Sequence, residues 1–290
     1  MMERQLCPLC GAHCPTGAVE SARVRSNVRA FRESEYRVWR CSSCRSIHAA
    51  GNVDLAAHYA AYPFHLLSRD VRLSIVYGKL LRRLRRSGLH RDSTILDYGC
   101  GSGAFVEFLR DRGFAAAVGY DEYNEDMAKP VRLRTRYDFV VAQDVLEHAE
   151  APLELMQRLN ELVRPGGIIA LGTPDADSID LARPSDFIHT LHAPYHRHIF
   201  SRFALELAAT AQRWTLERRY STMYTNTFVP FLNETFYRFY AGLFDDTLDA
   251  LFGPVDVRAL LRHLPRALWT GLFGAFSSRQ TDPMFVFRRS

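Results

Sequence analysis

The chain has 290 residues, of which 47% are hydrophobic and 24% charged, and its formal net charge is +5. This length suffices for one large domain with an appendage or for two domains, and the composition is ordinary for a soluble globular protein. No apolar run reaches the roughly 18 residues of a membrane span, and the N-terminal residues MMERQLCPLC lack a signal peptide's apolar core, so a cytoplasmic location is expected.

Residues 1–50 contain two Cys-x-x-Cys pairs. The four cysteines are Cys7, Cys10, Cys41 and Cys44. Four thiolates can surround a structural zinc ion tetrahedrally, and clustered cysteines in a chain without a secretion signal favour a metal over disulfides. EYRVWR (35–40) predicts a strand between the pairs. We therefore expect a zinc ribbon, with His13 and Cys14 as substitute ligands and four unrelated thiols as the other interpretation.

Residues 51–90 are expected to form a linker and a basic amphipathic helix. Tyr59, Tyr62, Phe64 and His65 in the linker would either fold over a cofactor or attach the ribbon to the core. Over 70–87, apolar residues repeat at helical spacing, with Lys and Arg on the opposite face. A basic face can attract a phosphate-bearing substrate or an anionic surface, but it also suits an ordinary solvated helix.

The stretch TILDYGCGSG (94–103) joins a short apolar strand to a helix through three alternating glycines, Gly99, Gly101 and Gly103. Glycine allows positive φ and a close approach of the backbone to a ligand. A second strand over 115–120 ends at Asp121, about 20 residues past the glycines. A carboxylate at that place can accept hydrogen bonds from both hydroxyls of a ribose.

Further strands and helices alternate along the rest of the core. Strands are expected at 138–142 and 167–172, with a helix at 150–163 between them and a helix and strand over 201–220. This order predicts an α/β fold with a doubly wound, mostly parallel sheet. Little chain separates the second and fourth strands of the expected fold, and Pro130 interrupts it, so its third strand should be short or absent.

These blocks together resemble the class I S-adenosylmethionine-dependent methyltransferases. The matching stretches are LDYGCGSG (96–103), GYD (119–121), YDFVVAQDVLEH (137–148) and LVRPGGIIALGTPD (162–175). The last two look like the branch that contains the ubiquinone-type O-methyltransferases. The resemblance covers 91–220 and the last strand, and it implies a Rossmann-like core with an antiparallel strand over 281–290.

The resemblance also implies which residues hold the cofactor, S-adenosyl-L-methionine. The residues expected at the methionine end are Asp97, Tyr98, Gly99, Cys100, Gly101 and Gly103. Those expected at the ribose are Asp121 and Glu122, and those on the adenine side are Gln143, Asp144 and Val145.

A histidine-rich segment follows at 185–201. Histidine titrates near neutrality and can serve as a general base, so His196 and His198 are the first candidates and His192 the next. The stretch PYHRHIFS is similar to the Tyr-His-Glu-His stretch of sugar C-methyltransferases with an N-terminal zinc module, with Arg197 in place of the Glu.

Residues 221–280 are rich in Phe, Tyr, Leu and Arg and predict amphipathic helices, the last bent at Pro265. Such an insertion before the final strand would form a substrate lid, or dock on a membrane surface or a second subunit.

The preferred function is methyl transfer to an oxygen or carbon atom of a small-molecule, sugar, glycan or lipid-linked acceptor. One alternative is an RNA methyltransferase that binds through the ribbon and the basic helix. Against it, AQDVLEH (142–148) is not the Asn/Asp-Pro-Pro-Tyr/Phe motif of enzymes that act on base nitrogens, and no array of aromatic and basic residues is evident. A noncatalytic protein of the same fold is the other alternative, which the intact glycine turn and Asp121 disfavour.

Overall fold

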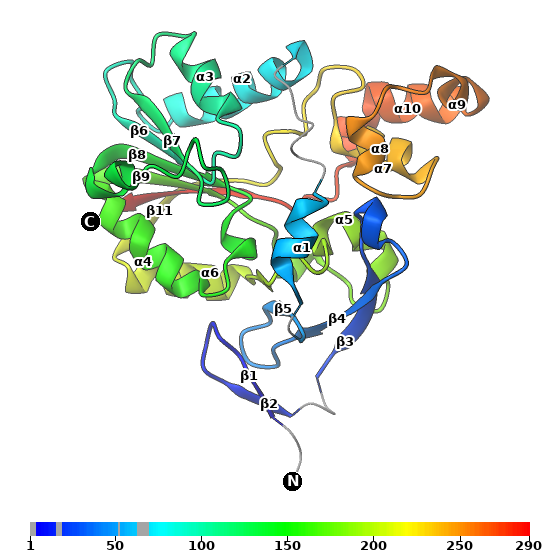
Figure 1. Ribbon diagram of the computed structural model, residues 1–290, viewed down its shortest axis with the longest axis horizontal. Helices are drawn as coiled ribbons and strands as arrows, with labels where there is room; N and C mark the ends of the chain where they lie inside the picture. Colours follow the sequence, from blue (N-terminus) through cyan, green and yellow to red (C-terminus); the bar gives the residue numbers. More distant parts are fainter. Residues whose placement is uncertain (1–3, 16–18, 52, 63–69) are drawn as a thin grey trace.

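The computed structural model describes residues 4–15, 19–51, 53–62 and 70–290 (Figure 1). Phe64 and His65, which were expected in the linker, lie outside the described residues. Within the described residues, no helix is both long and apolar enough to cross a membrane.

A six-stranded sheet forms the core, in the order β11-β12-β9-β8-β6-β7. Its strands are β6 (Ile95–Tyr98), β7 (Ala117–Tyr120), β8 (Tyr137–Gln143), β9 (Val163–Gly172), β11 (Trp214–Tyr220) and β12 (Met284–Arg289). β6 to β9 pair in parallel, whereas β12 runs antiparallel to both β9 and β11. The predicted fold class, a mostly parallel sheet with an antiparallel last strand, is confirmed.

Helices cover both faces of this sheet, as near-continuous apolar strands require (Figure 1). α2 (Val71–Arg85) and α3 (Ala104–Arg110) cover one face, and α4 (Pro152–Leu162) and α6 (Arg202–Ala211) cover the other. α2 begins where Asp70 accepts a hydrogen bond from the Leu73 N–H, and Ser201 caps α6 in the same way. The helices therefore start at the side chains that can satisfy their first free N–H groups.

No strand forms between β7 and β8, where every residue is described. A short 3-10 helix, η3 (Pro130–Arg134), takes its place, and the Arg132 guanidinium donates to the Gly119 carbonyl at the edge of β7. The expected shortening of the third strand is thus observed, and β7 becomes the edge of the sheet.

The N-terminal residues form two small sheets, which together we call the N-terminal module. One pairs β1 (Arg4–Leu6) with β2 (His13–Pro15), and the other has the order β10-β5-β4-β3, from β3 (Ser21–Arg25), β4 (Glu35–Arg40), β5 (Ile47–Ala49) and β10 (His198–Ile199). β10 belongs to the histidine-rich segment, so a distant part of the chain completes the N-terminal sheet. The buried Arg40 guanidinium also donates to the carbonyls of Ala176 (2.8 Å) and Ile179 (2.6 Å) after β9.

Short helices connect these parts. They are η1 (Arg29–Phe31), α1 (Leu55–Ala60), η4 (Leu146–His148), η5 (Ala176–Ser178), η6 (Pro184–Phe187) and α5 (Ile188–Leu191). In Figure 1, α1 lies between the N-terminal sheet and the core.

A group of helices between β11 and β12 lies to one side of the sheet (Figure 1). We refer to it as the lid, after one of the roles predicted from the sequence. Its elements are α7 (Glu234–Gly242), α8 (Asp249–Phe252), α9 (Val257–Arg262), α10 (Leu264–Phe273) and η7 (Gly274–Ser277). The helix expected to bend at Pro265 instead divides at His263, because proline is tolerated only in the first turn of a new helix.

Candidate functional site

The three glycines after β6 adopt positive φ angles of 76°, 54° and 82° at Gly99, Gly101 and Gly103. A Cβ added at Gly99 would lie 2.4 Å from Val145 Cγ2, and one at Gly103 would lie 2.6 Å from Met127 Cε. At Gly101 it would meet nothing within 4 Å. The positive φ angles therefore favour glycine at all three positions, and packing against Val145 adds to this requirement at Gly99. The space beside Gly101 stays open.

The carboxylate of Asp121, at the end of β7, meets this turn. Its Oδ2 accepts a hydrogen bond from the Gly101 N–H (2.8 Å), and its Oδ1 accepts one from the Tyr123 N–H (2.9 Å). The Asn124 side chain donates to the Gly101 carbonyl (2.8 Å). The two sequence motifs expected to share one ligand are thus in direct contact.

Two further acids from the predicted cofactor set lie nearby in buried surroundings. Burial, followed by the charge of Asp121, raises the pKa of Asp97 to about 8. Burial and then the charge of Asp282 raise the pKa of Asp144 to about 7. Asp144 also has a positive φ of 56°, and its N–H donates to the Gly172 carbonyl (2.9 Å) at the end of β9. Within the described part of the chain, neither carboxyl forms an ion pair with a cation that would stabilise its charged form.

Further members of the predicted cofactor set differ in their contacts. Gln143 donates to the Ala170 carbonyl at 2.9 Å, so its amide binds the sheet. The rings of Tyr98 and Tyr120 lie 5.3 Å apart, whereas Glu122 is exposed. The Cys100 thiol is half-buried against the backbone of β7.

A set of tyrosines and histidines lies next to these residues. We call it the tyrosine–histidine cluster, and its members are Tyr59, Tyr62, His148, His192, Tyr195 and His196. The Tyr59 hydroxyl lies 3.0 Å from His148 Nδ1, while its ring stacks on Tyr123 with centroids 5.2 Å apart. Because Tyr123 also donates its N–H to Asp121, Tyr59 connects the cluster to the glycine turn.

His192 is held from both sides. Its Nδ1 lies 2.5 Å from the side-chain amide oxygen of Asn27, and its Nε2 lies 2.8 Å from the Tyr62 hydroxyl. Because an amide oxygen can only accept a hydrogen bond, the ring hydrogen sits on Nδ1. Nε2 therefore accepts the hydrogen bond from Tyr62. Burial and then the neighbouring His196 and His148 hold the pKa of His192 well below its usual value, so the ring is neutral at pH 7. Asn27 comes from the N-terminal module, and no sequence pattern indicated its role.

His196 approaches a buried acid. Its Nδ1 donates to the Thr190 carbonyl (2.8 Å), and its Nε2 lies 3.8 Å from Oε1 of Glu147. Neither oxygen of this fully buried carboxyl, nor the buried Thr173 hydroxyl, has a hydrogen-bond partner in the described part of the chain. Burial and then the charge of Asp144 raise the pKa of Glu147 well above its usual range, so the surroundings favour the uncharged form of this carboxyl.

His198 lies elsewhere. As part of β10 it faces His48 of β5, with the two Nδ1 atoms 3.0 Å apart, and its Nε2 lies 3.3 Å from the Glu150 carbonyl oxygen. His48 Nε2 in turn lies 3.3 Å from the sulfur of Cys7. Of the three predicted base candidates, His192 and His196 therefore belong to the cluster, whereas His198 lies next to His48, which contacts Cys7.

The four predicted zinc ligands come together at the base of the N-terminal module. The sulfurs of Cys7, Cys10, Cys41 and Cys44 all lie within 4.8 Å of one another. A fifth thiol, that of the buried Cys14, lies 3.6 Å from the Cys41 sulfur. A second group of possible metal ligands among the described residues consists of Glu147, His148 and His196. One ring nitrogen of His148 already contacts the Tyr59 hydroxyl, and one of His196 donates to the Thr190 carbonyl.

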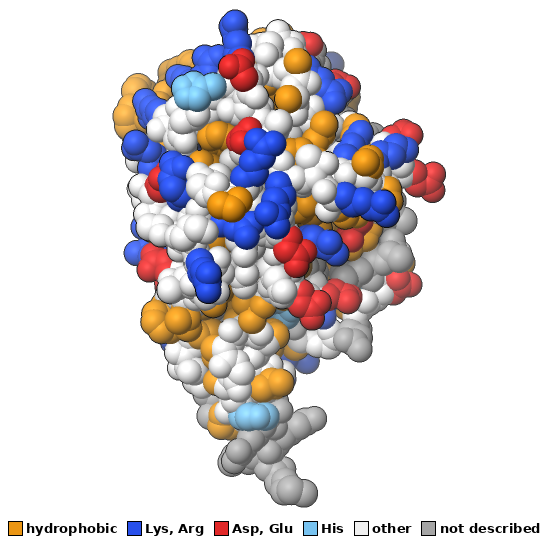
Figure 2. All heavy atoms as spheres, turned by 90° about the vertical axis from the view of Figure 1, so that its left-hand side faces the viewer, with side chains coloured by type: hydrophobic (Ala, Val, Ile, Leu, Met, Phe, Trp, Pro, Cys, Tyr) orange, Lys and Arg blue, Asp and Glu red, His pale blue; other side chains and the backbone are white. Residues whose placement is uncertain are grey.

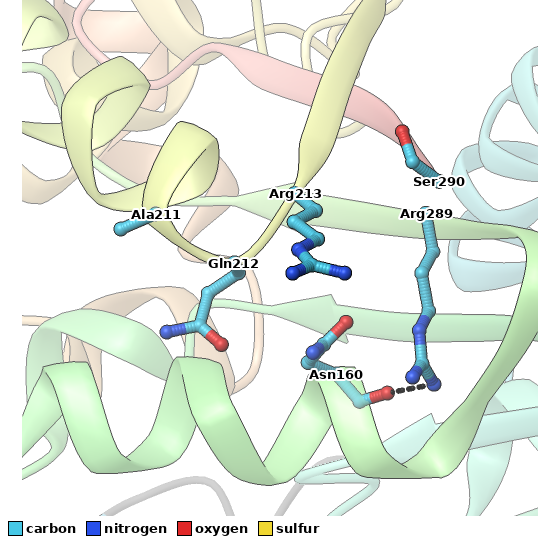
Figure 3. A pocket seen from close by; sticks show the side chains of 6 residues that line it. All are labelled: Asn160, Ala211, Gln212, Arg213, Arg289 and Ser290. Carbon is cyan, nitrogen blue, oxygen red and sulfur yellow. Dashed lines mark hydrogen bonds between the residues drawn. The ribbon is translucent and has the colours of Figure 1, made fainter.

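The described residues also form cavities outside these sites. One of about 210 Å³ opens where α4, α6 and the C-terminus meet, at the end of the sheet opposite the glycine turn (Figure 3). Its Arg289 donates to the Asn160 carbonyl (2.5 Å) and thereby satisfies the end of α4. Another, of about 410 Å³, lies between the histidine-rich segment and the lid, with His189, Arg238 and Arg279 in its wall.

A family model described as a methyltransferase domain matches residues 71–217, just over half of the chain. The chain therefore belongs to this methyltransferase-domain family, as the resemblance of its sequence predicted.

Curated relatives carry a more particular name. The ubiquinone biosynthesis O-methyltransferase of Leptothrix cholodnii is 30% identical over 102 residues, covering 27% of this chain and 43% of the relative. The protein of the same name from Caulobacter vibrioides is 28% identical over 136 residues, covering 38% of this chain and 54% of the relative. The chain thus spans about half the length of the curated relatives it matches.

Solved structures of similar shape include a putative sarcosine dimethylglycine methyltransferase from Galdieria sulphuraria, with a TM-score of 0.44, 19% identity and coverage of 74% of this chain and 84% of the other. The magnesium protoporphyrin IX methyltransferase of Synechocystis, with bound SAH, has a TM-score of 0.43 and 14% identity, covering 83% of this chain and 90% of the other.

Proposed function

We propose that the protein transfers a methyl group from S-adenosylmethionine to an oxygen atom of a small-molecule acceptor. The observation that carries this proposal is the position of Tyr59, whose ring stacks on Tyr123 beside Asp121 and whose hydroxyl reaches His148. It places the predicted cofactor residues and the tyrosine–histidine cluster at the same edge of the sheet. The curated relatives, named as O-methyltransferases, favour oxygen over carbon as the methylated atom.

The residues present fit the cofactor. When bound, S-adenosylmethionine supplies a methyl group on a positively charged sulfur. Asp121 would exchange its hydrogen bonds to the Gly101 and Tyr123 N–H groups for the two ribose hydroxyls, and the space beside Gly101 admits a ligand. The buried Asp97 and Asp144 carboxyls would gain a nearby cation that favours their charged forms. We propose the full predicted cofactor set on this basis.

For the acceptor proton we propose His192 as the base. Asn27 fixes the hydrogen on its Nδ1, so the lone pair on Nε2 faces the Tyr62 hydroxyl. A proton from an acceptor hydroxyl can pass to the Tyr62 oxygen as the phenol's own proton moves to Nε2. His196 is the second candidate. His198 lies in β10 beside His48, outside the tyrosine–histidine cluster, and is proposed to position β10 instead.

We propose that Cys7, Cys10, Cys41 and Cys44 hold a structural zinc ion. The support is the approach of four mostly buried sulfurs, with Cys7 and Cys44 3.7 Å apart and Cys10 and Cys41 also 3.7 Å apart. Four thiolates leave no open position for a reacting molecule, so the ion would stabilise the fold. Cys14 is a substitute ligand in this proposal.

The RNA alternative finds little support in the basic helix. In α2, the Arg83 side chain is buried against Tyr220, and the Lys79 ammonium donates to the Asn226 carbonyl. On the face shown in Figure 2, Lys and Arg side chains are interspersed with Asp and Glu. Lys79 and Arg83 of the predicted basic face therefore contact the segment that leads from β11 into the lid rather than facing solvent.

The test is to incubate the purified protein with methyl-labelled S-adenosylmethionine and a panel of phenolic, sugar and RNA acceptors, followed by mass spectrometry. The proposal expects label on the oxygen of a phenolic or other small acceptor. Label that appears only on RNA would contradict it, as would calorimetry that detects no binding of S-adenosylmethionine or its demethylated product.

A further inference from the structure

The outward side of helix α10 is apolar. Leu264 and Leu268 are exposed at four-residue spacing, and next to them Trp269 is 65% exposed and Phe273 is also exposed. The opposite side of the helix is buried against the rest of the lid. A helix at the surface of a globular protein normally turns its polar side outward, and here the exposed side is the apolar one.

The apolar surface continues beyond this helix. Phe276 of η7 and Phe228, from the segment before α7, are 78% and 72% exposed, and their ring centroids lie 5.2 Å apart. The Phe231 N–H donates to the Gly271 carbonyl (2.8 Å) and so fixes that segment against α10. We call this surface the lid face and define it by Phe228, Leu264, Leu268, Trp269, Phe273 and Phe276. Contiguous exposed apolar surface of this kind marks an interaction site.

The helices α9, α10 and η7 carry charges of a single sign. The sequence from 257 to 280 contains Arg258, Arg262, Arg266 and Arg279 but no Asp or Glu. The first three are exposed, and among the described residues none of them forms an ion pair with a carboxylate. Arg279 pairs with Asp186 instead. Arg266 lies over the ring of Phe239, 5.4 Å from its centroid, and lines the cavity beside the histidine-rich segment. Arg258 and Arg262 on α9, the helix directly before α10, therefore remain as exposed cations that form no ion pair among the described residues.

We propose that the lid face binds the surface of an anionic lipid bilayer. Exposed Trp and Phe side chains suit the boundary between headgroups and acyl chains, and the exposed arginines of α9 are attracted to anionic headgroups. A second copy of the chain fits less well, because a twofold contact would bring the unpaired arginines of both copies together with no acid to offset them. The proposal is independent of the methyl-transfer reaction.

Intrinsic fluorescence offers a direct test. The chain has three tryptophans, of which Trp39 and Trp214 are buried, so Trp269 alone is available to respond to a new environment. Adding vesicles of phosphatidylcholine mixed with phosphatidylglycerol should shift the emission to shorter wavelength, and pure phosphatidylcholine should shift it less. High salt should weaken the response, because it screens the arginines.

Two variants with a matched control separate the apolar and charged contributions in vesicle sedimentation. Replacing Trp269 and Phe273 together by Ser should lower binding by roughly tenfold or more. The double change Arg258→Gln and Arg262→Gln should lower it by roughly fivefold for each arginine, and only on anionic vesicles. Phe203→Ser removes an equally exposed aromatic (65%) from α6 and should leave binding unchanged.

The proposal is overturned if wild type and the Trp269/Phe273 variant sediment equally with anionic vesicles. It is also overturned if the wild type is a dimer that this variant converts to monomers, which would assign the lid face to a second copy. Calorimetric binding of S-adenosylmethionine, measured without vesicles, reports on the proposed function separately.

Discussion

At the scale of single residues, Asp121 carries the strongest prediction about the cofactor. Asp121→Ala should weaken binding of S-adenosylmethionine by about 2–4 kcal/mol, because the ribose hydroxyls lose a charged acceptor. Calorimetry measures the change, and Glu125→Gln, at an exposed position in the following turn, is the matched control. Equal affinities of the Asp121 variant and wild type would remove this carboxylate from the site.

His192 carries the corresponding prediction about turnover. His192→Gln should leave the affinity for S-adenosylmethionine unchanged but lower kcat by roughly 100-fold, because the proton acceptor behind Tyr62 is lost. His263→Gln, which changes an exposed histidine in the lid, should not alter kcat. If the His192 variant keeps its full rate while His196→Gln is slow, the base is His196.

The raised pKa of Glu147 predicts how the free energy of unfolding depends on pH. Because its pKa is raised in the folded state above the ordinary value of 4.5, the folded protein keeps this proton where the unfolded chain has released it. The stability that this carboxyl contributes is complete below about pH 4.5 and is lost as the pH rises towards the folded pKa. Glu147→Gln should therefore gain stability relative to wild type as the pH rises above about 4.5. Urea unfolding at several pH values measures this, and a constant difference would show that the carboxyl is ionised.

At the scale of elements, the cysteines should stabilise more than their own module. Cys7, Cys41 and Cys44 pack in the same core as Phe200 and Leu205, next to and within α6. Cys41→Ser, or treatment with a strong chelator, should therefore lower the Tm of the whole protein in calorimetry. A transition that keeps its Tm after chelation, in a protein shown to have lost its metal, would contradict this prediction.

Elements with a local signal were predictable, and those that depend on distant partners were not. The strands β6 to β9 and helices α2, α4 and α6 follow from apolar periodicity, and the glycine turn from its required φ angles. β10 has only two residues and exists because β5 lies beside it. Similarly, the Asn27–His192 contact and the unpartnered Glu147 carboxyl arise from tertiary packing, which leaves no periodic trace in the sequence. The basic stretch of α2 was predicted as one exposed face, but Arg83 turned out to be buried because a neighbouring segment covers it.

At the scale of the whole molecule, the parts that sequence composition separates are physically joined. Asn27 contacts the two histidines His189 and His192, and its carbonyl accepts a hydrogen bond from the Leu248 N–H of the lid at 2.7 Å. Asn27 is therefore the buried residue at which the N-terminal module, the histidine-rich segment and the lid meet. The division into residues 1–50, 51–90, 91–220, 221–280 and 281–290 stays a prediction.

The pairing of β5 with β10 constrains how the chain is made. During synthesis, the outer edge of β5 has no partner until His198 and Ile199 have emerged from the ribosome, long after the cysteines are in solution. A nascent chain would thus carry an open strand edge through about half of its translation, a period in which a chaperone would shield it from neighbouring chains.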